Sequence, residues 1–229
     1  MLGLWREKFK QDIYEAIGMS ECSYYISHSI YNPIRPGSAG FVQPGHTVKL
    51  LDPDTLEEVE DGEEGMICIG EDDPGLFLEY WQLEEETAKS RHDGYFFTGD
   101  YAKKDEDGYI WFIGRKDDII NTFGFRVSPH EIERVVKTHD AVADCVAFGL
   151  DIGKDKTIVG IAVIGHEELS KEKQAEILAF AQANLAKYKA PKEIFAMLDY
   201  PRTKNGKVLR KQLVKQLHEQ YHAIETGTK

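Results

Sequence analysis

The sequence predicts an α+β protein of two units: a β-rich, barrel-like first unit and a smaller second unit whose central sheet is flanked by helices. From residue 33 to residue 80, Gly and Pro recur between short apolar runs, which is typical of strands and turns. From residue 128 onward, helical and strand periodicities alternate. The charge also divides: residues 1–100 carry a balance of −14 and residues 101–229 a balance of +2.

The first unit is expected to be one helix followed by strands. Apolar residues at helical spacing predict a helix over Leu4–Ile17 that ends near Gly18. Apolar runs predict strands, arranged as a small barrel or sandwich, at Phe41–Val42, Val48–Leu51 and Met66–Ile69. The Asp107-Gly108 turn signal predicts a hairpin whose second strand is Tyr109–Ile113.

The second unit is expected to read helix, strand, strand, helix, strand, helix. Ser128-Pro129-His130-Glu131 has the pattern of a capping box, so the first helix starts there and runs to about His139. The later elements are predicted as strands Asp144–Leu150 and Thr157–Ile164, a helix Ser170–Tyr188, a strand Glu193–Leu198 and a last helix Val208–Ile224. Such an order describes an α+β domain of about a hundred residues.

The composition is that of an ordinary globular chain, with 229 residues, of which 41% are hydrophobic. No apolar run approaches the ~18 residues of a membrane span, and charges at residues 6–8 exclude a secretory signal there, so a cytoplasmic location is expected. The net charge of −12 argues against nonspecific binding to nucleic acid or anionic lipid. Cys22, Cys68 and Cys145 lack metal or redox spacing and are expected to be small buried residues.

Three polar motifs could carry chemistry. Asp100 directly follows Gly99, where a tight turn could hold a carboxylate against a diol, although turn chemistry alone also explains the pair. Gly114–Asp118 combines an arginine with two carboxylates, which suits a phosphate or ribose but also a solvated turn between domains. The cationic loop Pro201–Lys207 presents Lys207 after a glycine, and a plain surface lysine is the alternative.

Five motifs occur together in one order over essentially the whole chain. They are Gly18–Glu21, Gly65–Gly70, Tyr95–Asp100, Gly114–Asp118 continuing through Gly124–Glu133, and Pro201–Arg210. On these residues the chain resembles the carboxyl-terminal part of an adenylate-forming enzyme of the acyl-CoA synthetase, peptide-synthetase adenylation domain and luciferase superfamily. This resemblance outweighs the turn and surface explanations of the single motifs.

The resemblance implies that a carboxylate is joined to the α-phosphate of ATP and then transferred to a thiol, most often CoA, with Mg²⁺ and cations on the phosphates. It implies that Ser20 contacts the adenylate phosphate and that Glu21 helps to hold Mg²⁺. Asp100 would accept both ribose hydroxyls of ATP or AMP, with Arg115 beside it. Lys207 matches the lysine that bridges the carboxylate and α-phosphate oxygens.

The resemblance also implies a mobile second domain with its hinge at Asp117. Residues 1–116 would then be the β-rich part of a large AMP-binding domain, and residues 117–229 the mobile α+β domain. The segment around Gly124 would line the tunnel for the pantetheine arm of CoA, where a side chain would obstruct.

Arg126 is a weaker candidate for contact with nucleotide phosphate or CoA. An arginine beside a capping box can also pair with Asp118 or Glu131.

Some residues depart from the family pattern. Ile17 stands where many members place a tyrosine that stacks on adenine, and Asn121 replaces a common lysine. No Ser/Thr-Gly-rich-Lys phosphate loop occurs in the chain; Gly37–Gly40 is the only comparable stretch, and it has no lysine. The region that would form the acyl pocket is also not recognised.

We therefore expect a fragment of an ATP-dependent carboxylate–CoA ligase that is incompetent alone for the full reaction. Alternatives are one half of a split ligase and a non-catalytic module that binds CoA, nucleotide or a partner. The partner would be the missing N-terminal half, or a second copy, docking on an exposed apolar face within residues 1–80. The acid is not identified: only Cys22–His28 is expected to touch it, and Tyr24 and Tyr25 suit an aromatic or short aliphatic acid, or the core.

Overall fold

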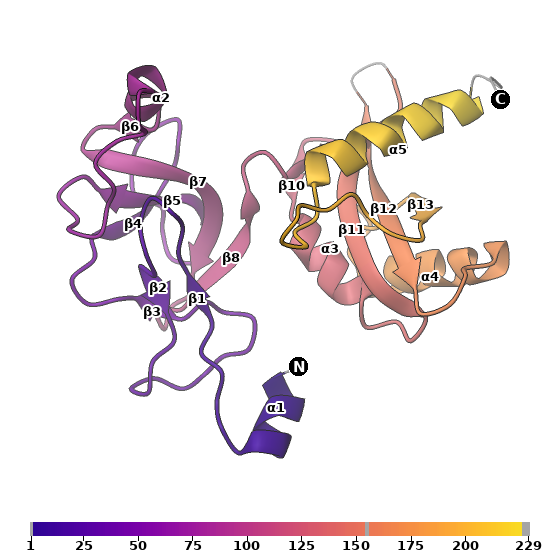
Figure 1. The fold of residues 1–229 in the computed structure, drawn as a ribbon, viewed down its shortest axis with the longest axis horizontal. Coiled ribbons are helices and arrows are strands. Elements are labelled where there is room, and N and C mark those ends of the chain that lie inside the picture. The colour runs from indigo at the N-terminus through magenta and orange to yellow at the C-terminus, as the bar shows by residue number, and fades with distance from the viewer. Residues whose placement is uncertain (1, 154–155, 226–229) are drawn as a thin grey trace. The chain divides into compact units, whose positions relative to one another are not determined.

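The computed structural model describes residues 2–153 and 156–225, and Figure 1 traces their helices and strands. The chain divides into two compact units, Met1–Asp117 and Asp118–Lys229, which we describe separately. The mixed α+β class is confirmed. The assignment of 1–116 and 117–229 to a large and a mobile domain stays a prediction. Among the described residues, no helix is long and apolar enough to cross a membrane.

The first unit contains two antiparallel sheets, and the predicted strands at 41–42, 48–51 and 66–69 are confirmed. The smaller sheet has the order β1 (Ala16–Ile17), β2 (Ile26–Ser27), β3 (Phe41–Val42). The larger sheet has the order β4-β5-β7-β6, with β8 also paired to β7; its strands are β4 (Val48–Leu51), β5 (Glu64–Gly70), β6 (Arg91–His92), β7 (Tyr95–Lys104) and β8 (Ile110–Arg115). A short helix, α2 (Glu84–Lys89), precedes β6.

The barrel-like arrangement expected from the sequence is not present among the described strands. A barrel requires a ring of paired strands, and here the larger sheet is joined to the smaller one only by an isolated bridge between Gly40 and Ile110. Strands of two residues supply too few ladder hydrogen bonds to carry the sheet around into a ring. The first unit is therefore a pair of open sheets.

The predicted helix over Leu4–Ile17 is too long. The helix α1 (Leu2–Phe9) ends where Lys10 adopts a positive φ of 54°, and Ala16–Ile17 belongs to a strand instead. No residue of α1 is buried, so packing does not extend the helix, and short helices are marginal without it. Ile17 packs against the core of the first unit.

The predicted hairpin at Asp107-Gly108 is confirmed as the connection between β7 and β8. The carboxylate of Asp105 organises this turn, because it accepts the backbone N–H groups of Asp107 and Tyr109 and the indole N–H of Trp111. Arg35 pairs with Asp105 at 3.0 Å. The hairpin thus fixes β8, which ends at Arg115, against β7.

From residue 128 onward the second unit has the predicted order of elements, and two short strands that were not predicted precede it. A three-stranded sheet has the order β11-β12-β13, with the first pair antiparallel and the second parallel. Its elements are β9 (Ile120–Thr122), β10 (Phe125–Val127), α3 (Pro129–Val136), β11 (Val142–Asp151), β12 (Thr157–Gly165), α4 (Lys171–Asn184), β13 (Glu193–Ala196) and α5 (Arg210–Glu225). The helices predicted to reach His139 and Tyr188 end three and four residues earlier.

Helices cover both faces of this sheet (Figure 1). On one face, α3 and α4 bury Ile132 and Ile177 in a core with Cys145 and Ile161. On the other face, α5 buries two leucines against Val146, Phe148 and Leu150. Because neighbouring residues of β11 point to opposite faces, one nearly continuous apolar strand serves both cores.

Candidate functional site

The predicted site residues fall into two groups. Ser20, Glu21, Asp100 and Arg115 belong to the first unit, and Gly124, Arg126 and Lys207 belong to the second. Asp117, the predicted hinge, is the last residue of the first unit. Each group is described within its own unit.

Asp100 and Arg115 face each other across the β7–β8 ladder. They are register partners, and the Arg115 Nε lies 3.2 Å from Asp100 Oδ1. The Asp100 side chain is 13% exposed and the Arg115 side chain 55% exposed. The structure therefore places a partly exposed carboxylate beside an arginine, and the role of this pair in binding a ribose stays a prediction.

Thr98 holds the backbone below this pair. Its hydroxyl donates to the Ile67 carbonyl at 2.8 Å and accepts the Asp100 N–H at 3.1 Å. The Lys116 N–H bonds to the Gly99 carbonyl at 2.7 Å. Two strands and a buried threonine thus fix the position of the carboxylate, a supporting role that sequence reasoning missed.

Tyr25 is fully buried, and the charge of the Asp100 carboxylate acts on its hydroxyl. Burial first, and then the charge of Asp100, raises the pKa of the Tyr25 hydroxyl, so the hydroxyl stays protonated. Within the described residues this hydroxyl has no hydrogen-bond partner. A buried phenol left unpaired costs free energy and is an exception that calls for an explanation.

Glu21 is half-buried and is held by Tyr80, whose hydroxyl donates to Glu21 Oε1 at 2.8 Å. Burial, and then this hydrogen bond, raises the pKa of Tyr80 to about 12. Ser20 precedes Glu21 and is exposed. A carboxylate steadied in this way is a suitable Mg²⁺ ligand, so the residues present fit the predicted metal role.

Lys207 ends the predicted loop in the second unit and is exposed. The loop is tied at its base, where the Thr203 N–H donates to the Lys207 carbonyl at 2.8 Å and the Thr203 hydroxyl accepts the Lys207 N–H at 3.1 Å. Arg202 donates to the Gly206 carbonyl at 3.1 Å. The backbone of the loop is therefore fixed while the ammonium faces solvent.

A buried ion pair lies beside the start of α5. Arg210 contacts Glu133 at 2.7 Å and donates to the Ala147 carbonyl at 2.6 Å, and its Nε lies 3.8 Å from Asp118. Burial opposes ionisation of Glu133, but bonds from His130, Arg210 and the Ala147 N–H outweigh it and lower the pKa of Glu133. This network, which the sequence did not reveal, joins Asp118, the first residue of the second unit, to the core of that unit.

Gly124 occupies the turn between β9 and β10. The two central residues, Phe123 and Gly124, both have positive φ, 48° and 83°, as a type I′ hairpin turn requires. A Cβ added to Gly124 would meet nothing within 4 Å, so backbone conformation explains this glycine within the second unit. The predicted obstruction of a tunnel stays a prediction.

Ser128 caps α3, as the capping-box pattern predicts. The Ser128 hydroxyl accepts the Glu131 N–H at 3.4 Å, and the Glu131 carboxylate pairs with Lys189 at 2.6 Å. Arg126 is exposed on β10, and Asp118 and Glu131, its suggested partners, have the ion pairs given above.

Sequence reasoning missed a cluster formed by Cys22, His46 and Asp73. The three free cysteines are buried as predicted, but Cys22 lies with these two side chains in a group whose ligand atoms are within 4.8 Å of one another. Burial and the charge of Asp73 raise the pKa of Cys22 to about 11. Three distant segments supply the residues, so no local spacing could have revealed the group.

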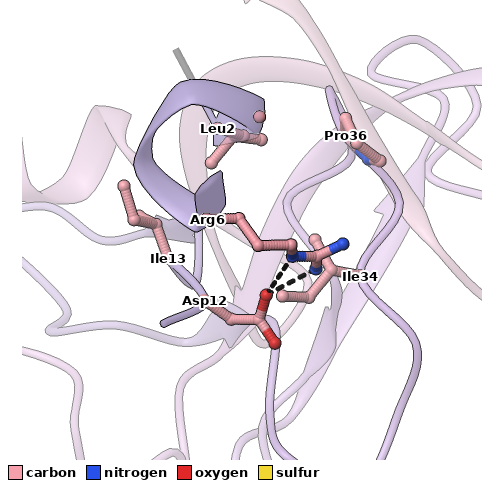
Figure 2. Close-up of a pocket in the computed structure, with 7 residues that line it drawn as sticks. Leu2, Arg6, Asp12, Ile13, Ile34 and Pro36 are labelled. Atoms are coloured by element: carbon pink, nitrogen blue, oxygen red, sulfur yellow. Dashed lines mark hydrogen bonds and ion pairs between the residues drawn. The ribbon is translucent and has the colours of Figure 1, made fainter. Parts of the chain in front are cut away.

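A surface cavity of about 210 Å³ is formed by residues near the N-terminus of the chain (Figure 2). It is lined by Leu2, Gly3, Arg6, Asp12, Ile13, Ile34 and Pro36. An ion pair between Arg6 and Asp12 crosses it, and none of the predicted site residues lines it. The cavity is a gap beside α1 whose charges neutralise each other.

Comparison with protein families gives two matches. Residues 2–81 match the family described as AMP-binding enzyme, and residues 131–207 match the AMP-binding enzyme C-terminal domain.

Curated relatives match along nearly the whole chain. A 4-hydroxybutyrate–CoA ligase of Metallosphaera sedula is 32% identical over 99% of this chain and 41% of its own length. A long-chain-fatty-acid–CoA ligase of Salmonella typhimurium is 33% identical over 91% of this chain and 36% of its own. The chain thus spans about two fifths of the length of these relatives.

A solved structure shows the same fold. ATP-bound MatB from Rhodopseudomonas palustris superposes with a TM-score of 0.86 at 31% identity, over 96% of this chain and 43% of that one.

Proposed function

Because the chain belongs to the adenylate-forming acyl-CoA ligase family, we propose that it carries part of the machinery of an ATP-dependent carboxylate–CoA ligase. Such a ligase joins the substrate carboxylate to the α-phosphate of ATP, releases pyrophosphate and transfers the acyl group to CoA. The chain would contribute the ribose, phosphate and thiol contacts. The proposal extends to ATP or AMP, Mg²⁺ and CoA as ligands.

The observation that carries this proposal is the arrangement around Asp100. Its carboxylate can accept hydrogen bonds from two vicinal hydroxyls, and Arg115, its register partner across the ladder, pairs with it at 3.2 Å and orients it. The unpaired hydroxyl of Tyr25 supports a ligand here, because a bound polar molecule or its water would supply the missing partner.

Ser20 and Glu21 are proposed to serve the phosphate end of the nucleotide. A hydroxyl can donate to a phosphate oxygen, and the Glu21 carboxylate, oriented by Tyr80, would hold Mg²⁺. The ion would supply charge neutralisation of the phosphates.

Lys207 is proposed to act on the developing charge between carboxylate and α-phosphate. A mobile ammonium on a fixed backbone loop suits that task, since it can follow charge as it moves. Asp117 is proposed as the hinge that brings this loop to or away from the nucleotide, and Gly124 and Arg126 as the thiol-side contacts after the movement.

We also propose that these 229 residues need a further segment for the complete reaction. They contain no Ser/Thr-Gly-rich-Lys phosphate loop. Large apolar side chains are exposed on the first unit, among them Ile30, Tyr31, Leu78 and Trp81, each at least 76% exposed. Such surface favours association with another half of the ligase or with a second copy.

Nucleotide binding by the chain itself is the first test. Calorimetry with AMP is expected to show saturable binding that weakens at least tenfold with 2′,3′-dideoxy-AMP, because the Asp100 carboxylate then loses both ribose hydroxyl donors. Asp100→Asn should weaken AMP binding similarly. Asp61→Asn, which removes only the exposed pair with Lys104, is the matched control and should have no effect.

Equal affinity for AMP and the dideoxy analogue would refute ribose recognition by Asp100, and absence of saturable binding would refute nucleotide binding altogether. Binding of AMP and CoA by a chain that never supports turnover with a second half would favour the non-catalytic module. Robust pyrophosphate release by the chain alone, with ATP and a panel of carboxylic acids, would contradict its dependence on a further segment.

The role of Lys207 is tested on the separate half-reactions, with the rest of the catalytic domain supplied. Lys207→Ala should slow adenylation by about a hundredfold or more, while thioester formation from preformed acyl-adenylate changes little. Lys204→Ala in the same exposed loop is the control. Equal losses in both half-reactions would contradict the assigned role.

The identity of the acid rests on Cys22–His28 only in part. Tyr25 is fully buried and packs in the core, whereas Tyr24 is 64% exposed with a φ of 44°. Tyr24 is therefore the one tyrosine of this stretch that we propose for substrate contact. The acid panel should be repeated with Tyr24→Ala, and an unchanged preference would remove Tyr24 from the pocket.

A further inference from the structure

The Cys22, His46 and Asp73 cluster joins three segments of the first unit that are far apart in sequence. Cys22 forms an isolated bridge with Leu76, His46 lies just before β4, and Asp73 lies in the loop after β5. His46 Nδ1 is 3.0 and 3.1 Å from the two Asp73 carboxylate oxygens and 4.0 Å from Cys22 Sγ. Cys22 is 1% exposed and Asp73 is 4% exposed.

The Asp73 carboxylate is held by the backbone. The Thr47 N–H donates to Oδ2 at 2.9 Å and the Gly75 N–H donates to Oδ1 at 2.8 Å. Each oxygen keeps a second lone pair. Hydrogen bonds of this kind orient the carboxylate ligands of metal sites and are as much a part of such sites as the ligands themselves.

The spacing suits a tetrahedral cation. With a metal–sulfur bond of about 2.3 Å and metal–nitrogen or metal–oxygen bonds of about 2.0–2.2 Å, neighbouring ligand atoms lie about 3.3–3.7 Å apart. The two His46–Asp73 separations, 3.0 and 3.1 Å, are below that range and the His46–Cys22 separation, 4.0 Å, is above it. The ligand atoms of Cys22 and Asp73 lie within 4.8 Å of each other, so shifts of about one ångström or less would bring all three ligands to the range.

We propose that Cys22, His46 and Asp73 bind a borderline-soft divalent cation of the Zn²⁺ class. A thiolate and an imidazole with one carboxylate are zinc ligands, whereas Mg²⁺ and Ca²⁺ prefer sites made of oxygen alone. Binding replaces the thiol proton, which leaves to solvent, and uses the Nδ1 lone pair of a neutral imidazole. Three protein ligands leave a fourth position for water.

The site would tie the segment that carries Ser20 and Glu21 to the β4–β5 sheet, because Cys22 directly follows Glu21. The proposal does not depend on ligase activity, since the ligands are defined by their geometry. The competing explanation is a metal-free cluster in which His46 donates to Asp73 and the thiol only packs beside them.

The test is metal titration of the chelator-treated 229-residue chain with Co²⁺ and then Zn²⁺. We expect one saturable site with a cobalt–thiolate charge-transfer absorption, displacement of Co²⁺ by Zn²⁺, and a higher melting temperature with Zn²⁺. Cys22→Ser and His46→Gln should each lower affinity at least tenfold. Cys68→Ala, at a buried thiol outside the cluster, should leave affinity unchanged.

The wild-type spectrum decides the proposal even where a variant fails to fold. Saturable binding without the thiolate absorption, or no saturable binding, would overturn it. Full affinity in Cys22→Ser would overturn it as well, because the metal would then sit on other histidines of the chain.

Discussion

The two units differ in how completely they satisfy their own buried polar groups. In the first unit the Tyr25 hydroxyl, His28 Nδ1 and Arg91 Nε are buried and make no hydrogen bond to any described residue. In the second unit the buried Tyr200 hydroxyl bonds to the carbonyls of Ala162 and Asp144, and the buried Glu133 carboxylate has an ion pair.

The same contrast holds for apolar surface. Of the large hydrophobic side chains that are exposed within the described residues, eleven belong to the first unit and five to the second. The second unit covers both faces of its sheet with helices, whereas nothing within the first unit buries α1 or the segment 78–83. The second unit buries its apolar core within itself. The first unit leaves apolar side chains exposed, as is typical of a surface that binds a ligand or another protein surface.

The largest expected effect tests the self-sufficiency of the second unit. Arg210→Met leaves the Glu133 carboxylate buried without its arginine partner and should lower the free energy of unfolding by about 3–5 kcal/mol. Far-UV circular dichroism in urea measures the loss, and hydrogen exchange in β11 and β12 assigns it to this unit.

A matched control removes a cation from an exposed pair of the same unit. Lys173→Met breaks the pair with Glu176, whose side chains are 44% and 56% exposed, and should cost at most about 1 kcal/mol. If both variants lost the same stability, the pair at Arg210 would not stabilise the second unit as a buried one.

Two glycines with positive φ give the next largest effect. A Cβ at Gly40 in the first unit would lie 2.3 Å from backbone atoms of residues 27 and 28, so Gly40→Ala should cost more than the ~1–2 kcal/mol of left-handed backbone alone. Gly124→Ala in the second unit meets open space and should cost only that strain.

Tryptophan fluorescence in urea measures the loss in Gly40→Ala, because Trp5, Trp81 and Trp111 all belong to the first unit, and hydrogen exchange in β11 and β12 measures the loss in Gly124→Ala. Equal losses for the two alanine variants would show that the backbone around Gly40 moves aside. That outcome would weaken the view that β2 and β3 are closely packed there.

Acid should destabilise the second unit through Glu133. Its pKa is lowered in the folded state, so the unfolded chain takes up the proton first as pH falls. The stabilisation is complete above the ordinary glutamate pKa, about 4.3, and is lost as pH falls through the lower folded value. The acid-dependent loss should be smaller than that of Arg210→Met and should shrink in Glu133→Gln, where Asp144, whose pKa is also lowered, would account for part of the remainder. A pH profile unchanged in Glu133→Gln would show that other carboxylates cause it.

Local chemistry explains what the sequence could predict of this fold. The strands of the second unit follow from runs of Val and Ile, and α3 follows from Ser128 and Pro129. The family motifs brought Asp100 and Arg115 into one site, and the ladder between β7 and β8 agrees with that pairing.

The failures have a common physical origin in contacts between distant segments. The helix predicted to reach Ile17 has no core to pack on beyond Phe9, and two-residue strands cannot close a barrel. The Glu133–Arg210 pair and the cluster around Asp73 join residues at least 24 positions apart, so no local sequence pattern predicts them.

The smallest expected effect is the change in stability when a buried tyrosine hydroxyl is removed, and we expect this change to have opposite signs in the two units. Tyr200→Phe removes a hydroxyl with two carbonyl partners and should cost about 1 kcal/mol. Tyr25→Phe removes a buried hydroxyl that no described residue satisfies, so it should leave stability unchanged or raise it by up to about 1 kcal/mol. Tyr31→Phe, at a side chain 86% exposed, is the neutral control.

If Tyr25 contacts the nucleotide, Tyr25→Phe rather than Tyr200→Phe should lose part of the stabilisation that AMP provides. Thermal unfolding with and without AMP would then show a smaller ligand-induced stabilisation for Tyr25→Phe than for the wild type, although the ligand-free variant is at least as stable. Tyr200→Phe, in the other unit, should keep the full ligand-induced shift. A Tyr25→Phe protein as destabilised as Tyr200→Phe would mean that its hydroxyl finds a partner inside the first unit, and the contrast in polar satisfaction between the units would not hold at Tyr25.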